Sequence, residues 1–474
     1  MTVIVLWLDR YGSHGGHTMA MGRRKTDRQD ALFITADNLP RSQGHPFYQA
    51  LNRLLAEAHF DRWIEARCEP YYEQVETRGQ RSIPPGTYFR MLMVGYFEGI
   101  DSQRGIAWRC ADSLSLRQFL GLTLEENSPD HSTLSLTRRR LPPEVFEEVF
   151  QFVLKMAAER KLLSGKTVGV DSTTLEADAA MKSIVRRDTG ENWKAYVTRL
   201  MREDGVIAKD EEPSDDEARR FDKGRKDKKV SNQEWFSPTD PDATITQMKD
   251  GTTHLAYKAE HVVDLQSDLI LAAEIRPTTH RDTQTLVDSV LKAEENLQAI
   301  GAEQSIEEVV ADKGYHAADA LELCDSLGLR TYIPEPRRKS EWHWTKRTPE
   351  HQRSVHGNRQ RVQREKGKQL QRRRSELCER SFAHVCDTGG MRRSWLRGLA
   401  DVTKRYLIAT AAHNLGRVLW KLLGVGKPRG MQGCGGAAWS FFALLGAPLH
   451  DVHLLRHFSA THTSGVAAPT LLMV

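Results

Sequence analysis

Two short β-branched runs that lie far apart in the sequence each end in an aspartate. In the first, residues 167–170 read Thr-Val-Gly-Val and lead into Asp171, after which Ser-Thr-Thr follows. Such a run predicts a buried strand rather than the start of a helix. A carboxylate at the end of a buried strand is costly unless a cation or a metal ion partners it. Taken alone, Asp171 is explained equally well as a residue that turns the chain or caps a helix.

The second run changes this balance because it repeats the pattern. Residues 309–311 read Val-Val-Ala and lead into Asp312, Lys313-Gly314 turns the chain, and the apolar spacing of residues 316–327 predicts a helix. Strand ends can bring carboxylates from distant parts of a chain to one point, and hard cations such as Mg²⁺ or Mn²⁺ prefer these oxygen ligands. Two aspartate-terminated strands are what a two-metal site needs, with a third carboxylate from a later element.

The segment from Arg374 to Val385 offers two carboxylates for the third position. With its apolar side chains pointing inward on a helix, Glu376 and Glu379 lie on different faces of that helix. The helical pattern by itself leaves both residues open as the third ligand.

These three segments resemble the DDE transposases of bacterial insertion sequences, in particular the insertion-sequence-4/5-like branch. The matching features are the strand ending in Asp171, the strand ending in Asp312 with Gly-Tyr just after it, and a glutamate on a late helix. The resemblance covers residues 20–425. It implies catalytic and metal-binding roles for Asp171, Asp312 and Glu379, because Glu-Arg-x-Phe at 379–382 best matches the family's pattern. Glu376 is the second choice.

The resemblance also implies an activity. A transposase of this kind uses two divalent ions, Mg²⁺ or Mn²⁺, to cleave DNA at the terminal inverted repeats of its element and to transfer the strands to a target. The implied partners are double-stranded element ends and target DNA, with a second copy of the chain in the synaptic complex. The implied location is the nucleoid in the bacterial cytoplasm, and neither a membrane nor a small-molecule substrate is implied.

The chain departs from the family around the glutamate. Relatives usually show a Tyr, an Arg and a Lys there, whereas this chain has an arginine at the Tyr position and no Lys within the next turns. Phosphate binding would then fall to other basic residues, and the candidates are Arg374, Arg380, Arg392 and Arg393.

Residues 26–163 predict an all-α N-terminal domain for binding DNA ends. Helical spacing recurs at 46–63, 84–97 and 142–163, and Pro-Asp-His-Ser-Thr at 129–133 starts a further helix with Asp130 or Ser132 as its cap. That helix carries Arg138, Arg139 and Arg140. Short helices before a basic one predict a helix-turn-helix module that reads a major groove. A packing domain with a solvated basic edge is the alternative.

Residues 164–423 predict the catalytic domain. Residues 254–275 read as a β-hairpin with Asp264 as a turn residue, followed by a helix at 283–299, the Asp312 strand with its helix, and a strand at 329–334. The order predicts an α/β fold, a mixed sheet with flanking helices, and it matches the ribonuclease-H-like fold that the resemblance implies. Acidic and basic blocks make residues 177–251 a polar insertion of loops or loose helices.

A strongly basic span lies between the second aspartate and the glutamate. Residues 336–375 carry an excess of 11 positive charges, more than the +5 of the whole chain. A basic run with stackable aromatic residues predicts contact with a DNA backbone and with an unstacked base. The residues that we select as DNA-binding are Arg337, Arg338, Lys339, Trp342, Trp344, Arg372, Arg373 and Arg374.

Composition narrows the remaining classes. A chain of 474 residues with 39% hydrophobic and 28% charged residues is typical of a globular protein of two or three domains, and no apolar run reaches the roughly 18 residues of a membrane helix. The six cysteines show neither a CxxC pair nor zinc spacing, which suits a reducing cytoplasm. We expect residues 1–25 to be disordered or to precede the true start, and residues 424–474 receive no role.

Two other functions share these features. A ribonuclease-H-like DNA nuclease would have the same carboxylates but would not join strands. A non-catalytic DNA-binding repressor would have no chemical need for the three carboxylates at all. A strand-transfer product separates the transposase from both.

Overall fold

The computed structural model describes residues 44–72, 82–226, 231–248, 251–337 and 348–428. Several predictions fall outside these described residues, namely those for residues 1–25, Arg338, Lys339, Trp342, Trp344 and residues 429–474. No helix in the described ranges combines the length and the apolar character that spanning a membrane requires.

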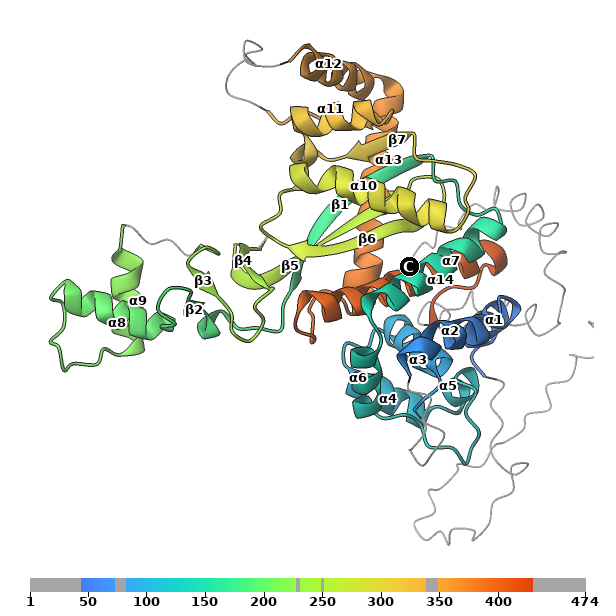
Figure 1. Cartoon of the computed structure of the whole chain (residues 1–474), viewed down its shortest axis with the longest axis horizontal. Helices are drawn as coiled ribbons and strands as arrows, with labels where there is room; N and C mark the ends of the chain where they lie inside the picture. The colour runs from blue at the N-terminus through green and yellow to red at the C-terminus, as the bar shows by residue number, and fades with distance from the viewer. Residues whose placement is uncertain (1–43, 73–81, 227–230, 249–250, 338–347, 429–474) are drawn as a thin grey trace, which may run out of the picture. The chain divides into compact units, whose positions relative to one another are not determined.

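A mixed sheet forms the centre of the described chain (Figure 1). Its strands are β1 (Thr167–Glu176), β4 (Thr244–Gln247), β5 (Thr253–Asp264), β6 (Ile270–Pro277), β7 (Glu308–Ala311) and β8 (Arg330–Tyr332). They follow the order β4-β5-β1-β7-β8, and β6 pairs with β5. The β1–β5 and β5–β6 pairs are antiparallel, whereas β1–β7 and β7–β8 are parallel. The predicted hairpin and the predicted mixed sheet are therefore confirmed.

Helices cover both faces of this sheet. They are α10 (Asp282–Ala299), α11 (Ala318–Ser326), α12 (Pro349–Gln363), α13 (Glu365–Phe382) and α14 (Leu399–Leu423). Alternation along β5 shows which face each helix covers: Glu260 accepts from Thr285 of α10, whereas the next residue, His261, bonds to Ser381 of α13. In Figure 1, α10 accordingly lies in front of the sheet and α13 behind it.

An all-α segment precedes the sheet, as predicted. Its helices are α1 (Pro46–Glu57), α2 (Phe60–Cys68), α3 (Pro85–Glu98), α4 (Gln103–Asp112), α5 (Leu114–Phe119), α6 (His131–Arg140) and α7 (Pro143–Glu159). Asp130 caps α6, because its Oδ1 accepts the N–H of Thr133 at 2.8 Å. Late helix α14 packs against both α7 and β6, so the helical segment and the sheet share one hydrophobic core.

The turn between β5 and β6 depends on Asp264, as predicted. Its Oδ2 accepts from Ser164 N at 2.9 Å, from Gly165 N at 3.1 Å and from Ser267 Oγ at 2.5 Å. The carboxylate therefore ties the hairpin turn to the segment that enters β1.

Residues 177–251 contain more structure than their charge blocks predict. Helices α8 (Trp193–Glu203) and α9 (Asp215–Gly224) pack through a small apolar cluster, and β2 (Val185–Arg186) pairs with β3 (Trp235–Phe236). The guanidinium of Arg186 lies over the rings of Tyr196 and Trp235, 4.7 and 5.7 Å from their centroids. A few aromatic and apolar contacts, which a charge-based prediction does not register, order the insertion.

Buried or half-buried asparagine side chains bond to the backbone at the edges of the sheet. In each case the side-chain carbonyl accepts the N–H of one edge residue and the side-chain amide donates to the C=O of the same residue. The pairs are Asn414 with Ile270, Asn358 with Ile333, and Asn232 with Ile245. Edge strands otherwise present unpaired backbone groups, so these amides complete the hydrogen bonding of the sheet.

Asn414→Ala is expected to lower the free energy of unfolding by about 3 kcal/mol, because it leaves the N–H and C=O of buried Ile270 without partners. Asn232→Ala is the matched control: Asn232 is half-buried, so water can replace its amide and the loss should be smaller. Urea denaturation of both variants measures the difference. Equal losses would contradict this account of the sheet edge.

Candidate active site

The parallel pairing of β1 and β7 brings the two predicted aspartates together. The last partners in the parallel register are Val170 and Ala311, so Asp171 and Asp312 are the next residues on neighbouring strands. The prediction that the first strand ends at Asp171 is wrong: β1 continues to Glu176 because it stays paired with β5, whereas β7 ends at Ala311, directly before Asp312. Asp312 Oδ1 accepts the N–H of Gly314 at 2.6 Å, which forms the turn that follows β7. Both aspartates are half-buried.

Helix α13 passes close over β1 just before Asp171. A Cβ on Gly169 would lie 2.9 Å from Arg374 Cγ and 3.2 Å from Cys378 Sγ, so the helix approaches where the strand has no side chain. Arg374 Nη1 lies 2.9 Å from Asp171 Oδ2, and both side chains are largely buried. Burial also raises the pKa of the Cys378 thiol, which stays neutral beside this ion pair.

The two candidate glutamates are neighbours on the exposed side of α13, and their contacts lead toward its two flanks. Glu376 accepts from Arg380, which also lies 3.0 Å from Asp268 in the β5–β6 turn. Glu379 lies on the other flank, where its Oε1 accepts from Ser375 Oγ at 2.8 Å. Both glutamates are exposed.

The position of the β5–β6 turn shows which flank of α13 faces the aspartates. Leu265 N bonds to Thr167 O at the start of β1, and Arg373, on the Glu376 flank, donates to Leu265 O. The Glu376 flank therefore faces the start of β1, and the Glu379 flank faces the end of that strand, where Asp171 lies. This geometry favours Glu379 over Glu376 as the third carboxylate.

The oxygen atoms of these carboxylates are suitable ligands for divalent ions, although the three carboxylates do not converge on one point in this structure. Asp171 and Asp312 supply oxygen ligands side by side, and the guanidinium of Arg374 already occupies a cation's place beside Asp171. Glu379 bonds to Ser375, and among the described residues no group of three His, Cys, Asp or Glu side chains is arranged to hold a metal ion. A closed site requires Glu379 to leave Ser375 and turn toward β1.

His261 fixes α13 to the sheet. It is the partner of Asp171 in the β1–β5 register, its Nδ1 lies 2.8 Å from Ser381 Oγ, and its ring stacks on Phe382 at a centroid distance of 4.1 Å. Burial lowers the pKa of His261 to about 3, so the ring is neutral. A π-helical turn, Ala383–Thr388, begins directly after these contacts. The sequence pattern predicts the strand that carries His261, but it does not indicate this partner.

A second group of residues on the α10 face was not predicted as part of the site. Ser172, Lys258, Glu260 and Asp282 form a hydrogen-bonded chain there. Their only sequence signal is charge at alternate positions of a strand, which normally indicates a solvent face. The structure buries that face under α10, and Glu260 is 1% exposed.

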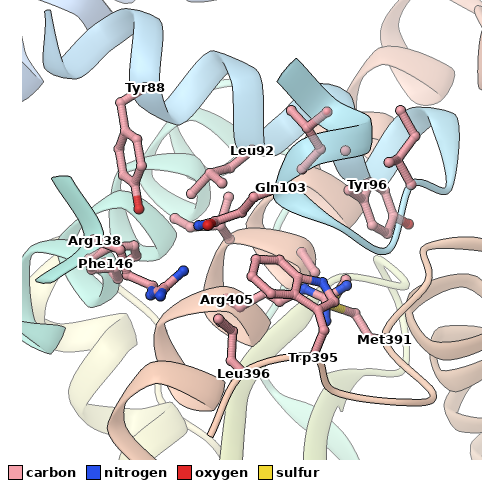
Figure 2. Close-up of a pocket in the computed structure, with 15 residues that line it drawn as sticks. Tyr88, Leu92, Tyr96, Gln103, Arg138, Phe146, Met391, Trp395, Leu396 and Arg405 are labelled. Carbon is pink, nitrogen blue, oxygen red and sulfur yellow. The ribbon is translucent and has the colours of Figure 1, made fainter. Parts of the chain in front are cut away.

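Arg138 does not lie on a DNA-facing surface, contrary to expectation. Its Nε is 3.1 Å from Asp401 Oδ2 of α14, and its side chain is 12% exposed. The residue lines a cavity of about 30 Å³ between α3, α4, α6 and the segment before α14, together with Tyr88, Trp395 and Arg405 (Figure 2). A helical pattern of three arginines does not reveal that the first of them faces α14.

Unpaired polar groups line this cavity. The Tyr88 hydroxyl, Arg138 Nη1 and Trp395 Nε1 have no hydrogen-bond partner among the described residues. Burial lowers the pKa of Arg405 to about 9. The cavity has room for water, which can satisfy these donors.

Arg374, also predicted to bind DNA, is 12% exposed and paired with Asp171, whereas several of the other described candidates lie at the surface. On α6, Arg139 is exposed and Arg140 is exposed over the ring of Tyr72, 4.7 Å from its centroid. Arg337, Arg372 and Arg373 are exposed as well.

A short segment after the π-helical turn extends the sheet beyond Asp171. Glu176 N bonds to Arg392 O at 3.0 Å and Ser394 N bonds to Glu176 O at 2.8 Å, which pairs this segment with the end of β1. Arg392 Nη1 donates to Thr173 Oγ1 at 3.1 Å, and the exposed Arg393 lies 3.7 Å from Glu176. Two arginines therefore lie at the strand that carries the first aspartate.

Comparison with known families gives two matches. A family model described as Transposase domain (DUF772) matches residues 36–140, and one described as Transposase DDE domain matches residues 170–415. The second match includes β1, β7 and α13 and covers more than half of the chain. No curated protein and no solved structure matched the chain.

Arg138→Ala is expected to lower the free energy of unfolding by about 3 kcal/mol, because it leaves Asp401 without its main partner in a largely buried ion pair. The exposed neighbour Arg139→Ala should change it by less than about 0.5 kcal/mol. Urea denaturation of the two variants tests this assignment. If Arg138→Ala leaves the stability unchanged, the structural role of the ion pair is wrong and Arg138 is again a candidate for DNA binding.

Proposed function

Because the chain belongs to the transposase DDE domain family, we propose that it binds the terminal inverted repeats of an insertion sequence and catalyses strand cleavage and strand transfer there. Members of this family are divalent-metal-dependent enzymes of DNA cleavage and transfer. The observation that supports the proposal best is the position of Asp171 and Asp312, next to each other where the parallel pairing of β1 and β7 stops, under a helix that carries Glu379.

In the proposed mechanism, Asp171, Asp312 and Glu379 are the catalytic carboxylates. When bound, two Mg²⁺ or Mn²⁺ ions would activate a water or a 3′-hydroxyl and stabilise the leaving oxygen in an in-line displacement. The two aspartates hold their oxygens at the strand ends, and Glu379 completes the set by leaving its bond to Ser375. Arg374 keeps the Asp171 carboxylate oriented through its 2.9 Å ion pair.

The proposed DNA surface surrounds these carboxylates. Arg392 and Arg393 lie at the extension of β1, and Arg372 is exposed on α13, where they can contact phosphates near the cleavage point. Arg373 would contact DNA toward the β5–β6 turn, because it donates to Leu265 O. We also propose DNA contacts for Arg337, Arg338, Lys339, Trp342 and Trp344. Arg139 and Arg140 would contact the element end, and Arg138 is left out of this set because it is paired with Asp401.

Two copies of the chain are part of the proposal. Two element ends have to be brought together before they are joined to a target, so a homodimer on DNA is the simplest assembly. Its substrates, the element ends and the target, are double-stranded DNA on the bacterial nucleoid.

The direct test is cleavage and joining of a labelled element-end duplex with Mg²⁺. Asp171→Ala, Asp312→Ala and Glu379→Ala should each reduce both products by more than about 100-fold, since even partners outside the ligand shell cost 10–100-fold. Glu376→Ala is the matched control, because Glu376 is a neighbouring exposed glutamate that pairs with Arg380, and it should retain activity. Cleavage without joining by the unmodified chain would indicate a nuclease, and binding without cleavage would indicate a repressor.

Arg392→Ala and Arg393→Ala should each weaken duplex binding and lower the salt slope of the binding constant by about 0.9 if each contacts one phosphate. Arg219→Ala is the matched control, because Arg219 is a 70% exposed arginine on α9 of the insertion. Binding isotherms at several salt concentrations measure the slopes. Unchanged slopes for both variants would remove these arginines from the DNA surface.

A further inference from the structure

A chain of charged side chains lies behind the two aspartates, on the α10 face of the sheet. Asp282 Oδ1, at the start of α10, accepts from Ser172 Oγ at 3.1 Å and lies 2.7 Å from Lys258 Nζ. The same ammonium lies 3.1 Å from Glu260 Oε2 and donates to Thr285 Oγ1 at 2.9 Å. Asp282 is therefore joined to the residue that directly follows Asp171.

Asp282 also reaches the segment that follows the second aspartate. A Cβ added to Gly314 would lie 3.1 Å from Asp282 Oδ2 and 2.9 Å from Asp312 Oδ1. The two carboxylates thus lie on either side of a glycine whose missing side chain lets both approach. One carboxylate on α10 therefore contacts the β1 end through Ser172 and packs against the turn after β7.

The charges in this group are fixed by burial. Lys258 and Glu260 are 5% and 1% exposed, and Arg276 Nη1 lies 3.5 Å from Glu260 Oε2. Lys258 and Arg276 therefore both face the buried Glu260 carboxylate, and Lys258 also pairs with Asp282, whose side chain is 35% exposed. A paired buried network holds its members in one arrangement, because moving any of them leaves another charge uncompensated.

We propose that Asp282, held in place by Lys258, is a positioning residue that sets the separation of the Asp171 and Asp312 carboxylates. It acts through Ser172 on one strand end and through the turn at Gly314 on the other, and it contacts neither DNA nor a metal ion. The inference rests on the proposed function, since it assigns Asp282 a role in that same site.

The expected consequence is a change in metal affinity. Residues that orient metal ligands from outside the ligand shell typically contribute 10–100-fold to metal affinity or activity. Asp282→Ala removes the contact with Ser172 and leaves Lys258 facing Glu260 alone, so Mn²⁺ binding should weaken at least tenfold. Asp282→Asn keeps an oxygen that can accept from Ser172 but loses the ion pair, and it should weaken binding less.

Two measurements test the inference. Titration of the full chain with Mn²⁺, in which electron paramagnetic resonance reports the free ion, gives the metal affinity. The Mg²⁺ concentration that gives half-maximal cleavage is measured on the same variants. Asp288→Asn is the matched control, because Asp288 is an exposed aspartate on the same helix. Its Mn²⁺ affinity should equal that of the unmodified chain. A purely structural loss would lower the amount of folded protein without changing the affinity of the folded fraction.

A second, smaller substitution keeps the inference testable if Asp282→Ala does not fold. Ser172→Ala deletes only the hydroxyl between β1 and Asp282, and it should weaken Mn²⁺ binding in the same direction by a smaller factor. If Asp282→Ala and Ser172→Ala both bind Mn²⁺ within twofold of the unmodified chain, the inference is wrong.

The variant Asp171→Asn distinguishes a failure of the positioning role from a failure of the proposed function. Loss of Mn²⁺ binding in Asp171→Asn, with normal binding in the Asp282 variants, overturns the positioning role alone. Normal binding in Asp171→Asn overturns the proposed metal site itself, and the positioning role with it.

Discussion

The parallel hydrogen bonding between β1 and β7 is the interaction on which the rest of the site depends. Its register pairs Val170 with Ala311, so two aspartates 141 positions apart in the sequence become adjacent where this pairing stops. A slip of one residue in either strand would turn one carboxylate to the opposite face. Val168 and Val170 on β1, and Val309 and Val310 on β7, are completely buried and hold this register.

Helices α13 and α10 then place different groups beside the two aspartates on the two faces of the sheet. On one face α13 contributes Arg374 to Asp171, and His261 fixes the helix to the sheet through Ser381. On the other face α10 contributes Asp282 to a buried network of opposite charges. Carboxylates that must lie close together repel each other, so cations built into both faces make their proximity tolerable before any metal ion binds.

The contact between the helical segment and the sheet is also part of the site's support. Helix α14 lies in one continuous core with α7, α3 and β6, and the chain that leads from the π-helical turn into α14 pairs with the end of β1. Arg138 pairs with Asp401 of α14 across this contact. A packed and hydrogen-bonded path therefore connects the N-terminal helices to the strand of Asp171.

The sequence by itself determined the fold class, the strand that carries Asp171, the strand that ends before Asp312, the β5–β6 hairpin and the all-α segment before them. These features depend on the local hydrophobic period and on turn residues. Only the tertiary structure shows that β1 continues to Glu176, that Arg138 pairs with Asp401, and that Asp282 bonds to Ser172 behind the aspartates. The reason is physical. A charged side chain in a sequence is predicted to face water, and whether it faces water or another element is decided only when distant segments of the chain pack together.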